Sequence, residues 1–269
     1  MADSQSLWKV RSRALLRARE HFRSGEPDGL HDLRVALRRI AATARALGRR
    51  KLERRAKKLA GTLSADRQLE VDRALLLRIR HMGLLSEGFA TALGARWESQ
   101  AASGASEDPA ITKEKRMRRL AREVRALAAN PRPTPVGRLL AEREEVEASL
   151  AVLPEHADDE TLHRYRLLIK RARYLAEDLV GCGRIDFEPL AARERAAQDV
   201  LGRWNDLRYF VKRIRCERGL AQSRGAVRLA SELDDLARAL EAPLARLRRD
   251  AVETAGQISS SFSVKARSA

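Results

Sequence analysis

The chain has 269 residues, and its 54 Lys and Arg against 37 Asp and Glu leave a formal net charge of +17 at pH 7. This charge favours a polyanionic partner, and the length allows one duplicated domain or two small ones, each with a real core. Ala, Leu, Arg and Glu dominate while Gly and Pro are sparse, which predicts an all-α fold.

The sequence also excludes several classes of protein. No apolar run approaches the roughly 18 residues of a membrane-spanning helix, and the N-terminus lacks the apolar region of a secretory signal. The two cysteines have neither metal-ligand spacing nor the density of a secreted disulfide scaffold. We therefore expect a cytoplasmic protein with no membrane partner.

Apolar periodicity and breaker residues divide the chain into helices. In chain order, helices are predicted at Ser6–His21, Asp28–Arg50, Lys51–Arg80, Leu84–Gln100, Ile111–Ala129, Gly137–Val152, Thr161–Val180, Phe187–Cys216 and Gly225–Ala255. Asp28 is the expected N-cap of the second helix. Residues 101–109 read as a loop, and the proline-rich segment at 131–135 marks a junction because it cannot remain helical. Residues 259–269 lack apolar periodicity and are expected to form a disordered tail.

The helix predicted at 28–50 carries two opposite stripes. At about 100° per residue, one arc of roughly 60° contains His31, Arg34, Arg38, Arg45 and Arg49. The opposite arc contains Leu33, Leu37, Ile40, Ala44 and Leu47. No carboxylate interrupts the cationic stripe, although like charges at i,i+4 cost a few tenths of a kcal/mol each. An anionic ligand explains why this repulsion is retained.

The same pattern returns in the second half of the chain. His163, Arg166, Lys170 and Arg173 lie on one face of the helix predicted at 161–180. The matching positions are His31 with His163, Arg34 with Arg166, Arg38 with Lys170, and Arg39 with Arg171. We interpret this as an internal duplication with halves at 1–130 and 131–258. The first half has 29 basic and 15 acidic residues, a net of +14, and the rest of the chain has 25 and 22, a net of +3.

Four motifs in order resemble the conserved histidine α-helical domain family, CHAD. They are H-x-x-R-V-x-x-R-R at His31–Arg39, L-S-x-x-R-Q at Leu63–Gln68, L-H-x-x-R-x-x-x-K-R-x-R-Y-x-x-E at Leu162–Glu177 and L-G-x-x-N-D at Leu201–Asp206. The resemblance implies two antiparallel four-helix bundles related by a pseudo-twofold, with a basic central groove or pore that binds inorganic polyphosphate. It also places both histidines in the ligand surface. Gln68 departs from the family pattern, in which this position is acidic.

We predict that a polyphosphate chain contacts the basic faces of both halves. Guanidinium groups on successive helical turns are spaced by about 5.4 Å, which suits a linear chain of phosphates. Each guanidinium can bind two phosphate oxygens at once. The predicted binding residues are His31, Arg34, Arg38, Arg39, Arg45, Arg49, Lys51, Arg55, Lys58, His163, Arg166, Lys170, Arg171, Arg173, Arg208 and Lys212. No cofactor is expected, and the location is cytoplasmic, with attachment to polyphosphate granules as the extension of the binding hypothesis.

Other interpretations stay open beside this one. Basic stripes are often only solvated faces. A nucleic acid is also a phosphate chain, but aromatics at 4% leave few rings for base stacking. An accessory role in phosphate metabolism is a further alternative.

We expect no catalysis, because no P-loop occurs and Glu142-x-Glu144 and Glu145-x-Glu147 both lack the lysine of an E-x-E-x-K motif. The spacing of the histidines gives no metal site. None of these patterns predicts the oligomeric state.

Three further expectations concern individual residues. Glu177 lies four residues after Arg173, which favours an ion pair that orients this arginine. Asp206 is expected to pair with a basic neighbour. The three tryptophans are expected in the core or at helix interfaces rather than on a base-stacking surface.

Overall fold

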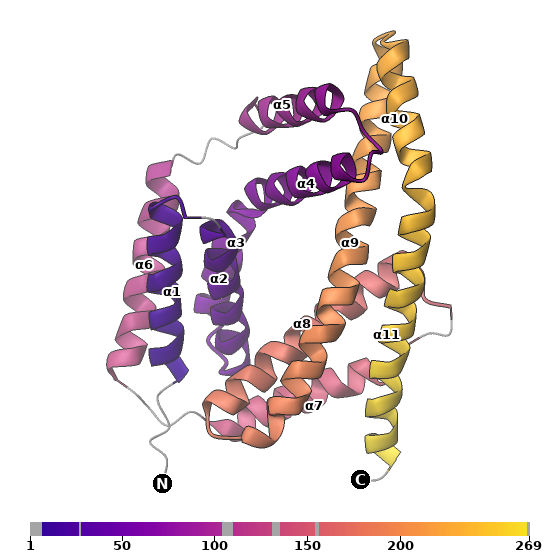
Figure 1. Ribbon diagram of the computed structural model, residues 1–269. Helices are drawn as coiled ribbons and strands as arrows, with labels where there is room; N and C mark the ends of the chain where they lie inside the picture. Colours follow the sequence, from indigo (N-terminus) through magenta and orange to yellow (C-terminus); the bar gives the residue numbers. More distant parts are fainter. Residues whose placement is uncertain (1–6, 27, 104–109, 131–134, 154–155, 268–269) are drawn as a thin grey trace. The chain divides into compact units, whose positions relative to one another are not determined.

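A computed structural model describes residues 7–26, 28–103, 110–130, 135–153 and 156–267 of the chain (Figure 1). Within these residues every regular element is a helix, so the all-α prediction is confirmed. The elements are α1 (Leu7–Arg23), α2 (Gly29–Ala46), α3 (Arg50–Thr62), α4 (Ser64–His81), α5 (Glu87–Ser103), α6 (Ala110–Ala129), α7 (Val136–Leu150), α8 (Asp159–Gly181), the 3-10 helix η1 (Ile185–Phe187), α9 (Glu188–Ser223), α10 (Val227–Ala239) and α11 (Glu241–Arg267). None of the described helices is both long enough and apolar enough to cross a membrane.

Two helices that the sequence predicts as continuous are each divided in two. The segment 51–80 breaks at Leu63, which is buried with φ −97° and ψ 8°. The segment 225–255 breaks at Leu240, whose side chain is 1% exposed. Pro243 follows in the first turn of α11, where its missing N–H prevents a helical hydrogen bond back into α10. Burial of a leucine at each joint is a tertiary effect that periodicity does not report.

The start of α2 differs from the predicted cap. Asp28 stands at the N-cap position with φ 64°, and its side chain makes no capping hydrogen bond. A Cβ on Gly29 would come within 2.7 Å of the His21 carbonyl oxygen. The close approach of α1 and α2 therefore depends on glycine at this position.

The predicted tail is largely helical. α11 continues to Arg267, and Phe262 is 4% exposed. The hydroxyl groups of Ser259 and Ser263 both donate to the Ala151 carbonyl at 3.0 Å. Because serine is polar, a prediction based on the spacing of apolar residues does not detect a helix in which serines occupy the buried positions. The predicted loop at 101–109 is likewise shortened, because α5 runs to Ser103. Residues 104–109, the junction at 131–134 and residues 268–269 lie outside the described part of the chain.

The chain forms two compact units, each built from three segments. Unit 1 consists of residues 1–67, 105–150 and 168–195, and unit 2 consists of residues 68–104, 151–167 and 196–269. The helices α8 and α9 contribute residues to both units. The predicted halves at 1–130 and 131–258 concern a sequence duplication, which stays a prediction.

In unit 1, the helices α1, α2, α3 and α6 share one hydrophobic core. Its centre includes Leu15, Leu37, Ile40, Ala56 and Val124, each with no exposed surface. The first three of these helices follow one another with short connections, and α6 closes the group against α1 and α3 (Figure 1). Trp8, at 6% exposure, belongs to the same core as expected.

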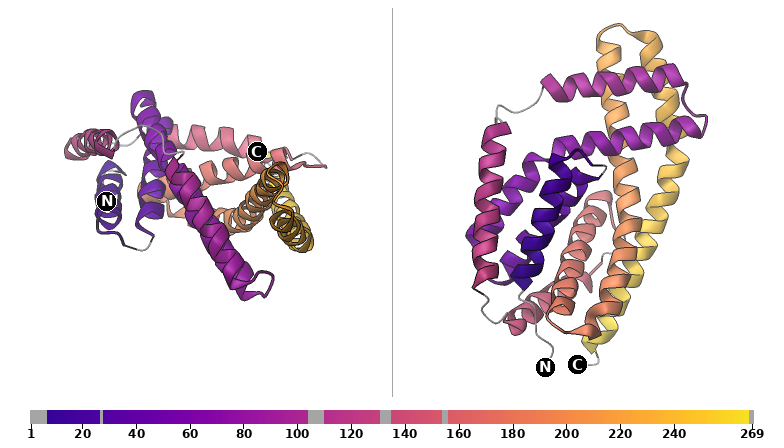
Figure 2. Two further views of the ribbon diagram at one scale, coloured as in Figure 1. Left: turned by 90° about the horizontal axis from the view of Figure 1, so that it is seen from above. Right: turned by 60° about the vertical axis from the view of Figure 1, so that its left-hand side comes forward.

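In unit 2, the helices α4, α5, α9 and α10 share a second core. Trp97 packs edge-on against Phe210 with ring centroids 5.7 Å apart, and both are fully buried. The chain turns back at Gly225, where φ is 68°, so that α10 and α11 run alongside α9 (Figure 2). Trp204 is also fully buried, so the core positions expected for the tryptophans are confirmed.

A buried arginine joins α7, α8 and α9 within unit 1. Arg143, 1% exposed, donates from Nη1 and Nη2 to the Glu194 carboxylate at 2.9 and 2.5 Å. It also donates from Nε to Glu147 at 2.6 Å and from Nη1 to the Ala172 carbonyl at 2.7 Å. Burial raises the pKa of Glu194, and the hydrogen bonds and charge of Arg143 act in the opposite direction.

We expect Arg143→Met to lower the free energy of unfolding by about 3–5 kcal/mol at pH 7.5, because it leaves Glu194 buried without a partner. Losing Arg143 raises the pKa of Glu194 further above its unfolded value. The folded variant then binds this proton more tightly than the unfolded chain, so the stability deficit shrinks as pH falls to 5. Urea unfolding of wild type and Arg143→Met at pH 7.5 and pH 5 measures this deficit. Arg143→Met/Glu194→Leu should recover most of the loss. An equal deficit at both pH values would contradict a buried charge as the cause.

Candidate functional site

The two predicted stripes of α2 separate in the structure as expected. Leu33, Leu37 and Ile40 are at most 2% exposed, whereas His31 and Arg45 are exposed and Arg38 and Arg39 are half-buried. Arg49, which the sequence places in the same stripe, is exposed but lies beyond the end of α2, at the N-cap of α3. The apolar stripe packs into the core of unit 1. Most of the cationic stripe is therefore available to a ligand.

Arg34 is the exception within this stripe. It is 6% exposed, and its Nη1 donates to the Leu63 carbonyl at 2.5 Å. This carbonyl belongs to the last residue before α4, and the Arg34 guanidinium is bound inside the fold rather than presented to solvent. The helical arc alone cannot distinguish this position, because α3 covers only part of the arc.

The basic residues of α8 gather around one tyrosine. Tyr174 is 4% exposed, and three cations lie over its ring: the guanidinium of Arg173 at 4.9 Å, that of Arg39 at 5.9 Å and the Lys170 ammonium at 5.9 Å from the centroid. The Tyr174 hydroxyl and the Nε atoms of Arg39 and Arg173 are buried without a hydrogen-bond partner among the described residues. The site thus contains hydrogen-bonding groups that a ligand can use.

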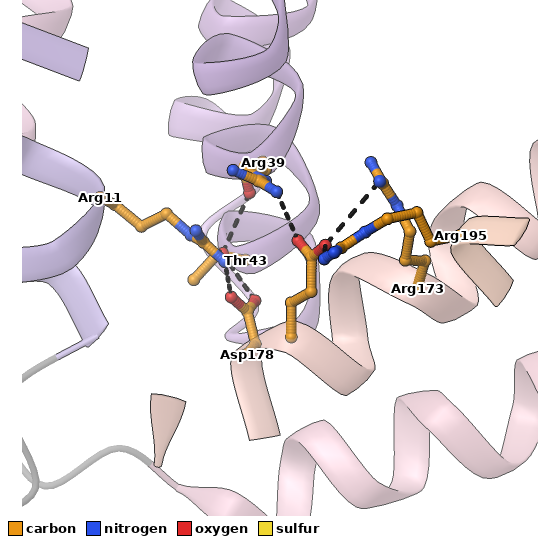
Figure 3. A network of polar contacts seen from close by, with 7 residues as sticks. Arg11, Arg39, Thr43, Arg173, Asp178 and Arg195 are labelled. Carbon is orange, nitrogen blue, oxygen red and sulfur yellow. Dashed lines mark hydrogen bonds and ion pairs between the residues drawn. The ribbon is translucent and has the colours of Figure 1, made fainter. Parts of the chain in front are cut away.

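Glu177 is the carboxylate at the centre of these cations. Its oxygens lie 2.9 Å from Arg39, 3.1 Å from Arg195 and 3.8 Å from Arg173 (Figure 3). The predicted pair with Arg173 is therefore confirmed, and the structure adds partners from α2 and α9. We call Arg39, Lys170, Arg173, Tyr174, Glu177 and Arg195 the Tyr174 cluster. Four cations against one carboxylate leave it a formal net charge of +3.

A buried ion pair supports this cluster from one residue away. Asp178 is fully buried, and it accepts hydrogen bonds from the Arg11 guanidinium and, at 2.7 Å, from the Thr43 hydroxyl. Burial raises the pKa of Asp178, opposed by the charge of Arg11 and the hydrogen bond of Thr43. The pair ties α8 to α1 and α2, so the neighbouring Glu177 and Tyr174 have a fixed backbone.

Other predicted binding residues are engaged by carboxylates. Arg45 and Arg171 both contact Glu142 of α7, Arg45 at 3.0 Å. Arg55 pairs with Glu123 of α6. These arginines have part of their charge compensated within the protein. Lys51 and Lys58 are exposed on α3, and no contact joins them to the Tyr174 cluster within the described residues.

His31 lies in a basic environment. Desolvation lowers its pKa most, and the positive charges of Arg67 and Lys170 lower it further, against the opposing effect of Asp32 and Asp28. The free protein therefore disfavours a charged imidazole at this position. Arg67 belongs to the L-S-x-x-R-Q motif, so the first and second sequence motifs meet in unit 1.

The third and fourth motifs meet in unit 2. His163 Nδ1 lies 3.0 Å from Asn205 Oδ1, and the His163 and Tyr209 rings form a T-shaped pair with centroids 6.4 Å apart. Arg208 pairs with Asp159 at 3.3 Å, and Arg166 is half-buried. Asn205 and Arg67 occupy the same position of their motifs, so each unit places a histidine beside that position.

Tyr174 and Arg195 were not among the predicted binding residues. Tyr174 stands inside the quoted α8 motif, but its aromatic character predicts core packing. Arg195 lies outside all four motifs, and no sequence pattern points to it. The described residues contain no group of three or more His, Cys, Asp or Glu that could hold a metal ion.

Comparisons with known proteins agree with this architecture. The chain matches the solved structure of PptA from Streptomyces chartreusis with a TM-score of 0.66 at 20% identity, covering 93% of this chain and 96% of that one. It matches the CHAD domain from the plant Ricinus communis with a TM-score of 0.64 at 19% identity, covering 93% and 92%. A comparison with curated proteins found no match. The family model for the CHAD domain matches residues 8–215, most of the sequence, and the chain therefore belongs to the CHAD domain family.

Proposed function

We propose that this chain binds inorganic polyphosphate, without catalysing a reaction, through the Tyr174 cluster and the exposed cations of α2. The observation that carries the proposal is the convergence of four cations, three of them paired with Glu177 and three lying over Tyr174. The buried hydroxyl of this tyrosine has no hydrogen-bond partner among the described residues. The CHAD family is linked to polyphosphate and triphosphate binding. Attachment to polyphosphate granules is an extension of the same proposal.

The chemistry of the cluster matches a phosphate chain. Phosphate oxygens accept charge-assisted hydrogen bonds, each worth about 1.5–3 kcal/mol. The Tyr174 hydroxyl and the Nε atoms of Arg39 and Arg173 supply uncommitted donors. A second anion also relieves the repulsion among guanidinium groups that Glu177 compensates only in part. A linear polyanion can continue from this cluster along exposed residues such as His31 and Arg49.

The first prediction concerns site and chain length. We expect Lys170→Ala/Arg195→Ala to weaken binding of long-chain polyphosphate at least tenfold, by isothermal titration calorimetry at one fixed salt concentration. Arg119→Ala/Arg122→Ala, on the exposed face of α6, removes the same charge from unit 1 and should change affinity less than threefold. Long chains should bind more tightly than pyrophosphate and compete successfully against duplex DNA. Equal losses in both variants would leave net charge, rather than this cluster, as the cause.

The second prediction concerns pH. Because the pKa of His31 is lowered in the free protein and a bound phosphate raises it, binding takes up a proton. Affinity should therefore increase as pH falls from 8 to 6, and calorimetry in buffers of different ionisation enthalpy should detect the proton. His31→Gln should flatten this dependence, and His163→Gln provides the comparison in unit 2. Identical pH dependence in wild type and His31→Gln would show that His31 does not face the ligand.

The third prediction concerns Glu177. Glu177→Gln keeps the shape of the side chain but leaves Arg39, Arg173 and Arg195 without a shared counter-charge. We expect it to lower the melting temperature by several degrees without ligand, consistent with a loss of about 1–3 kcal/mol. Polyphosphate should then raise the melting temperature of Glu177→Gln more than that of the wild type, because it replaces the missing charge. Scanning calorimetry measures both melting temperatures. An equal rise in Glu177→Gln and wild type would show that polyphosphate does not bind at this cluster.

A further inference from the structure

A hollow on unit 2 has a different character from the Tyr174 cluster. It has a volume of about 400 Å³ and lies beside the middle of α9, with one wall from α11. Its lining combines three cations, Arg208, Lys212 and Arg215, and one carboxylate, Asp159, with Tyr209, Val211, Cys216 and Leu244. The volume lies within the range of small-molecule sites, which are mostly apolar with a few placed polar groups.

The cations of the hollow differ in how far the protein uses them. Arg208 is held by Asp159 at 3.3 Å, and Arg215 reaches Glu241 at 3.5 Å. Lys212 is exposed, and the described residues show no ion pair or hydrogen bond for its ammonium group. Lys212 therefore offers a charge that the fold does not need, and Arg215, whose pair is long and solvent-exposed, can turn to the same ligand.

Tyr209 gives the hollow a flat apolar surface. The residue is 40% exposed, so part of this tyrosine in the lining of the hollow faces solvent. The His163 and Tyr209 rings form a T-shaped pair with centroids 6.4 Å apart, and the Arg208 guanidinium lies over the Tyr209 ring at 5.5 Å from its centroid. Neighbours on two sides thus fix the orientation of a ring that remains open to solvent.

We propose that this hollow binds a nucleoside phosphate, with the base stacked on Tyr209 beside Leu244 and the phosphates on Lys212 and Arg215. A bare phosphate chain would gain nothing from Tyr209 and Leu244, whereas a base buries both and stacks on the ring. One platform suffices for one base, so the low aromatic content of the chain is no obstacle. The inference does not rest on polyphosphate binding at the Tyr174 cluster, because none of the residues it uses belongs to that cluster, although Arg208 and Lys212 are also among the polyphosphate-binding residues predicted from the sequence.

Cys216 gives the hollow its own reporter. This exposed free thiol lines the hollow, so an occupant should shield it from alkylation. We expect saturating ATP to slow iodoacetamide labelling of Cys216 at least fivefold, measured by mass spectrometry of the wild-type chain. Tripolyphosphate at the same concentration should slow it less than twofold, and labelling of Cys182 should be unaffected by either compound. Equal protection by ATP and tripolyphosphate, or none by ATP, would overturn the proposal.

Substitutions test the two parts of the ligand separately. Tyr209→Ala should weaken ATP binding about tenfold and leave tripolyphosphate binding unchanged, whereas Tyr209→Phe should retain ATP affinity. Lys212→Ala should weaken ATP binding at least fivefold, and Arg224→Ala, just beyond the end of α9, is the charge-matched control. Lys170→Ala/Arg195→Ala should keep ATP protection of Cys216, which separates this site from polyphosphate binding. Wild-type ATP affinity in Tyr209→Ala with unchanged helical circular dichroism would refute base stacking. If Tyr209→Ala does not fold, the other two variants still test the proposal. Loss of ATP affinity in Tyr209→Phe, or wild-type ATP affinity in Lys212→Ala, would contradict it.

Discussion

One carboxylate shared by three guanidinium groups sets the geometry of the cationic surface of unit 1. Without Glu177, the arginines of α2, α8 and α9 would repel one another and turn outward into water. With it, Arg39 and Arg195 converge on Glu177 of α8, and Arg39 also lies over the Tyr174 ring. The compensation is partial, since the cluster keeps a formal net charge of +3. The surface is therefore organised before any anion arrives and still attracts one.

The precision of this arrangement comes from ion pairs that never meet solvent. Arg11 with Asp178 and Arg143 with Glu194 fix the helices from which the exposed cations project. Such pairs contribute little net free energy of folding, but breaking one is costly because it leaves a buried charge without a partner. They therefore select one packing of the helices and add little to its stability. The basic residues of the chain thus divide into buried groups that hold the fold and exposed groups that present charge.

The two units carry parallel motifs with different surroundings. In unit 1 the histidine faces Arg67 and Lys170, an environment of positive charge that suits a bare polyanion. In unit 2 the histidine contacts Asn205 and forms a T-shaped pair with Tyr209, whose side chain also lines a hollow of mixed polar and apolar residues. The strongly basic first half and the nearly balanced second half show the same contrast at the level of composition.

Much of this protein can be read directly from its amino-acid sequence. Helical periodicity predicted the all-α fold, the buried face of α2 and the pair of Arg173 with Glu177, because these depend on residues three or four apart. Contacts between distant segments are different. That Arg34 turns inward to Leu63, that Arg195 joins the cluster from α9, and that α11 continues through the serines to Arg267 all depend on which helix packs beside which. A local pattern shows which face of a helix is charged, and only the packed neighbours decide whether that charge is buried, paired or free to bind.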